Sequence, residues 1–379
     1  MKAVVGLGFA ALVVGSALAA ACSDAPDSGT SRPELDDATI AELGALADNA
    51  IAAGIPGVTL AIQAGDQTVT IARGVADSAT GATMTPAHHV RMGSVAKSFL
   101  ASIVLQLEDE RKLSLSDTIE SRLPGMVTGN KDATIEQVLR LQSGSFDHAS
   151  DARYLTPYLE GHFDYAYTPQ ALIALSNDHP PVFAPGAQFN YSNTNYVIIG
   201  LIIEKITGKS LADVVAERIT RPLGMNETTM PLGSEMEAPA AHGYLVGMGD
   251  PIDVTGISAS SAYGHGNAVS TPADMNRFYG ALVAGKVVNP SRLPDMFTPD
   301  ARIDTQYGIG VWAKDNFPPC SNWIGHDGAS PGFDNASYAR RDGKRQVTVS
   351  ITQLTPDDKA GDEKAQKAWG DLVIAAGCK

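Results

Sequence analysis

Basic residues are scarce in this chain. Its 379 residues include 28 Lys and Arg against 42 Asp and Glu, which gives a formal net charge of −14. Nucleic acid is therefore not an expected partner, because it is bound by positively charged surfaces. We interpret the excess of acidic residues as a property of a soluble surface.

Metal-binding patterns and repeats are also lacking. No pair among the eight histidines has a convincing metal-ligand spacing, so we expect neither a metal site nor another cofactor. Seven of them are interpreted as surface or core residues: His88, His89, His148, His162, His179, His242 and His265. Without an internal repeat or a long linker, residues 36–379 are expected to form one domain around a large core.

Charge is absent between Lys2 and Cys22. The apolar run of residues 3–21 closes on small residues, which is typical of an export signal. Its end, Leu18-Ala19-Ala20-Ala21-Cys22, resembles a bacterial lipoprotein signal, in which the Cys becomes the lipidated first residue. Such signals usually carry Leu three residues before the Cys, where this chain has Ala19. A cleaved secretory peptide and an uncleaved anchor are the alternatives.

We therefore expect residues 1–21 to be a signal peptide and Cys22 to anchor the protein to a membrane through a lipid. The protein would lie on the outer side of the cytoplasmic membrane or in the periplasm, and otherwise be secreted. Residues 22–35 lack apolar periodicity and are predicted to be a flexible tether. In an oxidising compartment Cys320 and Cys378 are expected to form a disulfide, the alternative being two buried thiols.

Periodicity predicts strands near both ends of the chain and helices between them. A helix capped at Asp36 and Asp37 precedes strands at 58–64 and 67–72. Further helices are predicted from Ser94, over 196–206 before Gly208, and over 272–283 after Thr271. Late strands at 307–311, 322–325, 335–339 and 346–352 precede a final helix over about 358–375.

This order of elements favours an α/β (α+β) fold. One antiparallel sheet would be built from both chain ends and flanked by helices, with a mostly helical lobe inserted between them. The sheet lobe is predicted at about 36–93 and 296–379, and the helical lobe at about 94–295.

Three motifs carry groups suited to acyl transfer: Ser94-Val95-Ala96-Lys97, Tyr191-Ser192-Asn193 and His326-Asp327-Gly328. The patterns S-x-x-K, Y-x-N and H-x-G each occur once, and it is their order and flanks that carry the inference. Ser94 at a helix start lies where N–H groups and the helix dipole stabilise an alkoxide. Burial of Lys97 on the same helix face would lower its pKa until it accepts the Ser94 proton. A helix cap followed by a solvated lysine is the alternative.

The second motif adds a proton relay and an amide. Tyr191 can pass a proton between Ser94 and the leaving group, provided that a cation such as Lys97 favours its phenolate. Asn193 can offer its amide to the substrate backbone. A core tyrosine beside an asparagine helix cap is the alternative.

The residues around these motifs resemble the penicillin-recognising serine hydrolases: 91–99, 185–193 and 325–333, with further matches at 221–225 and 270–274. Within that group the chain is most similar to the serine D-alanyl-D-alanine carboxypeptidases, whose plan class C β-lactamases and related esterases share. The resemblance covers roughly residues 36–379 and implies a DD-peptidase/β-lactamase-like fold. It also implies that the three motifs meet at one site.

The resemblance assigns binding roles to the third motif. His326 and Gly328 would line a strand edge along which the acyl chain lies, since Gly permits close backbone approach. The N–H groups of Ala329 and Ser94 would form the oxyanion hole.

Three positions depart from the carboxypeptidase branch. There an Arg and two hydroxyl residues hold the free carboxylate of the terminal D-alanine. The aligned residues here are Trp312, Asp327 and Ala329, none of which can pair with a carboxylate. An ionised Asp327 would repel one. Lys314 is a candidate replacement, on the same strand face as Trp312 but at another depth.

The sequence therefore predicts an exported serine hydrolase with a Ser94 acyl-enzyme intermediate, most like a D-alanyl-D-alanine carboxypeptidase acting on peptidoglycan-type peptides. An esterase, an amidase or a D-amino-acid peptidase of the same family is the first alternative. A β-lactamase or a slowly acylating penicillin-binding lipoprotein is the second. Expected partners are acyl peptide, ester or amide substrates, β-lactams as acylating ligands, and a membrane through the lipid anchor.

Overall fold

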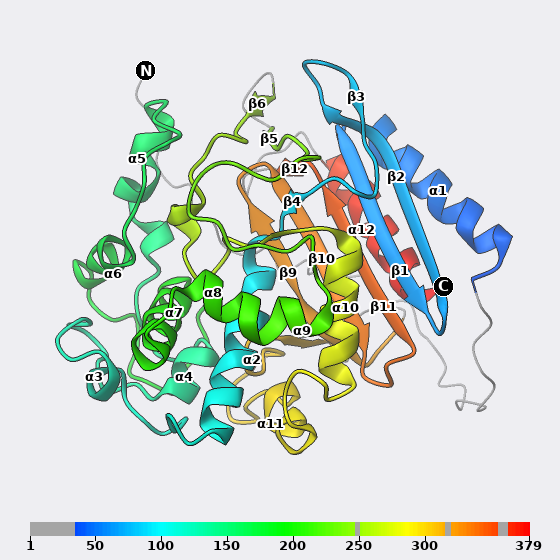
Figure 1. The fold of residues 1–379 in the computed structure, drawn as a ribbon. Coiled ribbons are helices and arrows are strands. Elements are labelled where there is room, and N and C mark those ends of the chain that lie inside the picture. The colour runs from blue at the N-terminus through cyan, green and yellow to red at the C-terminus, as the bar shows by residue number, and fades with distance from the viewer. Residues whose placement is uncertain (1–34, 247–250, 315–319, 355–362) are drawn as a thin grey trace.

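A computed structural model describes residues 35–246, 251–314, 320–354 and 363–379. Its centre is a seven-stranded antiparallel sheet in the order β3-β2-β1-β11-β10-β9-β8 (Figure 1). The strands are β1 Gly57–Ala64, β2 Gln67–Asp77, β3 Ala82–Thr83, β8 Trp312–Lys314, β9 Trp323–Ser330, β10 Phe333–Arg340 and β11 Arg345–Ile351. Pairing of β1 with β11, in which Leu60 faces Val349, joins the two ends of the chain. The predicted fold class is confirmed.

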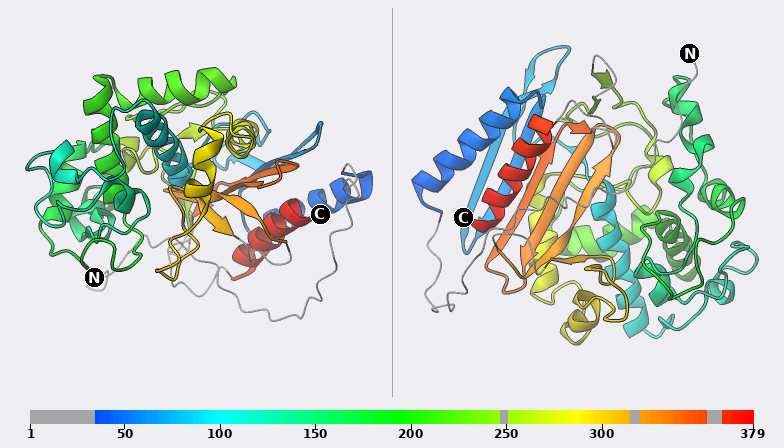
Figure 2. Two further views of the ribbon diagram at one scale, coloured as in Figure 1. Left: turned by 90° about the horizontal axis from the view of Figure 1, so that it is seen from below. Right: turned by 180° about the vertical axis from the view of Figure 1, so that it is seen from behind.

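Two terminal helices cover one face of this sheet, as Figure 2 shows. They are α1 (Asp37–Ala52) and α12 (Glu363–Cys378), and they pack on the apolar side chains of β1, β10 and β11. A disulfide joins Cys320, just before β9, to Cys378 at the end of α12, with 5.6 Å between the Cα atoms. For a separation of 58 residues, the chain-entropy model gives a stabilisation of roughly 4 kcal/mol.

The other face of the sheet packs on the helical lobe, mainly through its helix α10. The lobe's helices are α2 Ala96–Asp109, α3 Ile119–Arg122, α4 Ile135–Leu139, α5 Ala152–Leu159, α6 Pro169–Asn177, α7 Thr194–Thr207, α8 Leu211–Val215, α9 Arg221–Leu223, α10 Pro272–Val283 and α11 Leu293–Phe297. Short strands complete it: β4 Val90–Arg91 with β7 Val269–Ser270, and β5 Tyr244–Leu245 with β6 Ile252–Asp253 and β12 Gln353–Leu354.

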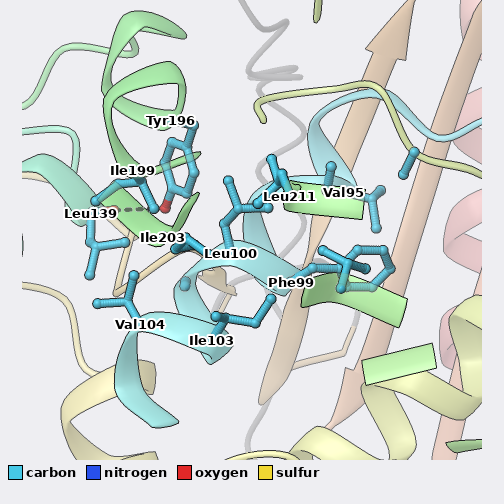
Figure 3. Packing of buried hydrophobic residues seen from close by; sticks show 14 of the residues in the cluster. Val95, Phe99, Leu100, Ile103, Val104, Leu139, Tyr196, Ile199, Ile203 and Leu211 are labelled. Atoms are coloured by element: carbon cyan, nitrogen blue, oxygen red, sulfur yellow. Dashed lines mark hydrogen bonds between the residues drawn. The ribbon is translucent and has the colours of Figure 1, made fainter. Parts of the chain in front are cut away.

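Helix α2 is the centre of the lobe's core. Phe99, Leu100 and Ile103 project from it among buried side chains of α7 and α8 (Figure 3). Tyr196 of α7 is also buried, and its hydroxyl donates to the Leu139 carbonyl at 2.9 Å. Such packing on all sides holds α2, and with it the residues at its N-terminal end, in one position.

Several predicted boundaries are confirmed. Thr271 caps α10 by accepting the Asp274 N–H, and Gly208 ends α7 with φ +68°. The predicted strand at 307–311 is wrong. There the Gly308 N–H donates to the Val311 carbonyl at 2.8 Å, which makes a turn, and the strand starts only at Trp312.

The N-terminal predictions fall outside the described residues. These are the signal peptide over 1–21, lipidation of Cys22 and all of the tether except Leu35. Within the described ranges, no helix combines the length and the apolar character that crossing a membrane requires.

Candidate active site

Ser94 lies in a short helical turn, η1 (Gly93–Val95), that leads directly into α2. The turn begins with Gly93 at φ +54°, a left-handed conformation that favours glycine. Ser94 is partly exposed, whereas the residues on either side of it are buried. Its hydroxyl thus lies at the N-terminal end of a 14-residue helix, as the motif predicted.

Lys97 is fully buried, and its side chain returns to Ser94. Its Nζ donates hydrogen bonds to Ser94 Oγ (2.8 Å), Asn193 Oδ1 (2.8 Å) and the His265 carbonyl (3.0 Å). Burial lowers the pKa of Lys97 to about 7, and the charge of Asp147 opposes this shift in part. A neutral amine keeps two N–H donors, which the oxygens of Asn193 and His265 can accept. The lone pair of neutral Lys97 then faces the Ser94 hydroxyl.

The side chain of Asn193 is held from two sides. Its Oδ1 accepts from Lys97, and its Nδ2 donates to Asp147 Oδ2 at 3.2 Å. The backbone N–H of Asn193 donates to Asp147 Oδ1 at 3.0 Å. Because an amide nitrogen carries two hydrogens, one remains beyond these bonds for a substrate carbonyl.

Tyr191 covers another side of Lys97, whose Nζ lies 4.8 Å from the centre of the phenol ring. The Tyr191 hydroxyl is buried and has no hydrogen-bond partner among the described residues. Burial raises the pKa of Tyr191 far above its usual 10.0, and the nearby Ser94 hydroxyl, outside hydrogen-bond geometry, opposes this only in part. The expectation of a phenolate is therefore wrong, and Tyr191 is a neutral phenol.

The third motif lies in β9, directly against the turn that carries Ser94. A Cβ added at Gly328 would come within 2.0 Å of the Met92 carbonyl oxygen, and one added at Gly93 within 2.3 Å of the Ala329 carbonyl oxygen. Asn335 of β10 links β9 to β4, the strand just before this turn, because its Nδ2 donates to the Gly328 carbonyl at 2.8 Å and to the Arg91 carbonyl at 2.9 Å. Glycine at these positions thus brings the backbone of β9 next to the nucleophile turn.

His326 lies within β9, and its expected place along a substrate-binding strand edge stays a prediction. It is 1% exposed, and its Nε2 lies 3.1 Å from the Tyr307 hydroxyl. Burial, together with the charge of Lys97, lowers the pKa of His326 to about 3, which leaves the ring neutral at pH 7. His326 supports the site from behind Tyr191, at 6.3 Å between ring centres.

Trp312 belongs to a row of aromatic side chains beside the site. We call this row the aromatic wall: Phe189, Tyr191, Tyr307 and Trp312, with neighbouring ring centres 4.9 to 6.5 Å apart. The half-buried Trp312 occupies the position at which the carboxypeptidase branch is expected to have an Arg. The wall therefore offers apolar surface where that branch offers a positive charge.

Asp327 does not face Ser94. Since the open side of Gly328 is turned to Met92, strand alternation turns the side chain of Asp327 to the opposite face of β9. There Asp327 Oδ2 accepts a hydrogen bond from Lys314 Nζ at 2.8 Å. The side chain of Asp327 is thus turned from Ser94, but its charge still acts to raise the pKa of Tyr191 and of His326, so the expected repulsion of a substrate carboxylate stays a prediction.

Sequence reasoning missed Asp147, which is 7% exposed and bonded to Asn193. An Asp in a stretch with several Ser and no helical period indicates a turn, and only tertiary structure brings it to the site. Tyr307 was likewise assigned to a strand and given no role. Among the residues that the structure describes, no cluster of His, Cys, Asp and Glu could hold a metal ion.

Comparison with known families matches the Beta-lactamase model to residues 37–368. Among characterised proteins, penicillin-binding protein 4* of Bacillus subtilis is 28% identical, over 64% of this chain and 56% of that protein. The teichoic acid D-alanine hydrolase of Staphylococcus aureus is 26% identical, over 64% of this chain and 58% of that protein. The chain thus spans somewhat more than half the length of each.

Two solved structures match over nearly their whole length. A D-stereospecific amidohydrolase from Streptomyces sp. is 30% identical with a TM-score of 0.78, covering 91% of this chain and 99% of that one. The D-amino acid amidase of Ochrobactrum anthropi SV3 is 25% identical with a TM-score of 0.79, covering 89% and 98%. These matches agree with the resemblance read from the three motifs.

Proposed function

The chain belongs to the Beta-lactamase family of penicillin-recognising serine hydrolases, and on that premise we propose that it is an amidase or esterase acting on D-amino-acid derivatives through an acyl enzyme on Ser94. The observation that carries the chemistry is the Lys97 Nζ, which lies 2.8 Å from Ser94 Oγ and has its other two hydrogen bonds to fixed oxygens.

Acylation begins with neutral Lys97. It takes the hydroxyl proton of Ser94 as Oγ bonds to the substrate carbonyl carbon, which gives a tetrahedral oxyanion and a Lys97 ammonium. The N–H groups of Ser94 and Ala329 are proposed to stabilise the oxyanion. The remaining Nδ2 hydrogen of Asn193 is proposed to orient a substrate carbonyl.

Tyr191 completes the proton transfer as a neutral phenol. Its hydroxyl gives a proton to the leaving nitrogen or oxygen as the bond to the carbonyl carbon breaks, and it takes a proton from the Lys97 ammonium. Water then attacks the acyl ester, its proton returns to Ser94 through the same groups, and the acid is released. The Tyr191 hydroxyl has no hydrogen-bond partner among the described residues, which leaves it ready for this contact.

The aromatic wall supports the choice of substrate. An apolar ring at Trp312 suits an uncharged amide or ester better than the free carboxylate that a D-alanyl-D-alanine carboxypeptidase must bind. The names of the two structural neighbours point in the same direction, since one is a D-stereospecific amidohydrolase and the other a D-amino acid amidase. These observations favour the amidase or esterase, the first alternative from the sequence, over the D-alanyl-D-alanine carboxypeptidase that the sequence predicts first.

Hydrolysis of D-alanyl-D-alanine peptides is the second candidate, which the similarity to penicillin-binding proteins favours. β-Lactams are proposed as acylating ligands on the same grounds. A β-lactamase or a slowly acylating penicillin-binding protein would differ from our proposal in the rate of deacylation.

Matched substrates test the proposal. We expect purified protein to cleave the 4-nitroanilide of D-phenylalanine at least tenfold faster than that of L-phenylalanine, and faster than N-acyl-D-alanyl-D-alanine. A Ser94→Ala protein serves as the blank. Equal rates for both enantiomers, or fastest cleavage of the D-alanyl-D-alanine peptide, would reject the amidase assignment.

We further propose that the protein is exported and lipid-anchored. The uncharged run of residues 3–21 before Cys22 supports this, and the Cys320–Cys378 disulfide suits an oxidising compartment. A Cys22→Ala variant should lose its membrane partition or accumulate unprocessed. Unchanged partition would indicate an uncleaved anchor instead.

A further inference from the structure

Asp147 lies next to the catalytic groups without belonging to any of the three motifs. It precedes the short helical turn η2 (His148–Ser150) and is 7% exposed. Its Oδ1 accepts the backbone N–H groups of Ala149 (3.3 Å) and Asn193 (3.0 Å), and its Oδ2 accepts from Asn193 Nδ2 (3.2 Å). A carboxylate therefore lies on the far side of Asn193 from Lys97.

This carboxylate decides which end of the Asn193 amide faces Lys97. With Nδ2 on Asp147, the oxygen Oδ1 is turned to Lys97 and accepts its hydrogen bond. A flipped amide would set a donor against the lysine and an acceptor against the carboxylate, and both contacts would be lost in a buried site. The carboxylate thus excludes the flipped amide.

Asp147 also supplies a negative charge beside Lys97, which the other described titratable groups around this lysine do not. Among the described residues, the titratable side chains that interact with Lys97 are Asp147, His148, Tyr191, Tyr196, His265 and His326. Burial lowers the pKa of all three histidines and raises the pKa of both tyrosines, so these five are neutral at pH 7. Burial raises the pKa of Asp147 only to about 6, so Asp147 is charged at pH 7.

We propose that Asp147 is a positioning residue for proton transfer, which fixes the Asn193 amide toward Lys97 and, by its negative charge, sets the pH at which Lys97 loses its proton. This inference rests on the proposed role of Lys97 as the base for Ser94. It assigns Asp147 no contact with the substrate.

The test compares kcat/KM for a chromogenic ester between pH 5 and 9 in three variants. Asp147→Asn removes the charge that favours the Lys97 ammonium, so the acidic limb should move down by roughly one pH unit. Its plateau should fall at least tenfold, because the Asn193 amide can then flip. Asp147→Glu keeps the charge, so its limb should stay within about 0.3 pH unit of the wild type while its plateau falls.

Asp151→Asn is the matched control. Asp151 is equally buried, at 7% exposure, but its carboxylate binds Arg153 and His179. We expect its acidic limb to coincide with that of the wild type. If Asp147→Asn does not fold, Asp147→Ser removes the charge while keeping an acceptor oxygen for Asn193, and the same shift is expected.

The outcomes separate this inference from the proposed function. An unmoved acidic limb in the charge-removing variant of an active enzyme would overturn the role of Asp147 alone. If the wild type neither turns over nor becomes acylated, the proposed function fails. The ionisation of Lys97 is then followed by the 15N chemical shift of its Nζ, and the signal is assigned by its absence in Lys97→Met. The pKa of Lys97 must then be lower in Asp147→Asn than in the wild type.

Discussion

Lys314 Nζ lies 2.8 Å from Asp327 Oδ2, on the face of β9 turned away from Ser94. This ion pair engages Lys314, the lysine that could have replaced the carboxylate-binding Arg of the carboxypeptidases. Trp312, the residue aligned with their Arg, lies in the aromatic wall. Neither Trp312 nor the ion-paired Lys314 therefore offers a substrate carboxylate an uncompensated positive charge.

From this we predict selectivity against free carboxylates. A charge-assisted hydrogen bond to a carboxylate is worth roughly 1.5–3 kcal/mol, so kcat/KM for acyl-D-alanyl-D-alanine should be about ten to a hundred times lower than for its amide. Lys314→Met should leave this ratio unchanged. A preference for the free acid that disappears in Lys314→Met would assign the carboxylate to Lys314.

A second prediction concerns pH. The base is the neutral form of Lys97, whose pKa burial lowers to about 7. Protonation below this pH removes the base, so kcat/KM should rise through pH 7 and level off above it. The measurement is a rate profile at constant ionic strength, with Ser94→Ala subtracted. Activity that declines from pH 6 to 8 would show that the ammonium is the active form.

Tyr191→Phe separates chemistry from stability. The Tyr191 hydroxyl is buried without a hydrogen-bond partner among the described residues, so its loss leaves no other group unpaired. We expect a melting temperature at or above that of the wild type, with turnover lower by roughly 10² to 10⁴. Retained turnover would exclude Tyr191 from the proton relay.

The Lys97→Ala variant should lose as much activity as Tyr191→Phe, because the losses of turnover are not additive for groups that act together.

Gly328→Ala tests the contact between β9 and the nucleophile turn. Its Cβ would come within 2.0 Å of the Met92 carbonyl oxygen, so one of the two segments must move. We expect a loss of about 1–3 kcal/mol in unfolding free energy and a large loss of activity. Gly370→Ala is the control, because that glycine lies within α12 with nothing within 4 Å of an added Cβ. It should be neutral or stabilising by up to about 1 kcal/mol.

The sequence was sufficient for the local elements and for the three motifs. Hydrophobic periodicity placed α1, α10 and the β1–β2 pair, and the cap residues Thr271 and Gly208 set two boundaries. These signals are local, so a single chain carries them. Tyr307 shows where they fail: the pattern reads as a strand, but Gly308 and Gly310 turn the chain there, and Gly310 lies against Ala101 of α2.

Parts of the site depend on contacts between distant segments. No sequence pattern links Asp147 to Asn193, and burial is the main reason that Tyr191 is a phenol and His326 is neutral. The orientation of Asp327 follows from the face of Gly328 that meets Met92, which is a tertiary contact. Charge states and side-chain directions of this kind come from packing and desolvation, which are properties of the folded chain.

Intact mass after incubation with a labelled penicillin tests the covalent role of Ser94 most directly. The wild type should gain the mass of one penicillin, located by peptide mapping to the segment containing Ser94. Ser94→Ala should gain none while keeping its melting temperature, because Ser94 makes no side-chain cap and its hydroxyl only accepts from Lys97 among the bonds described. The same adduct on the Ser94→Ala protein would contradict the acyl-enzyme on Ser94.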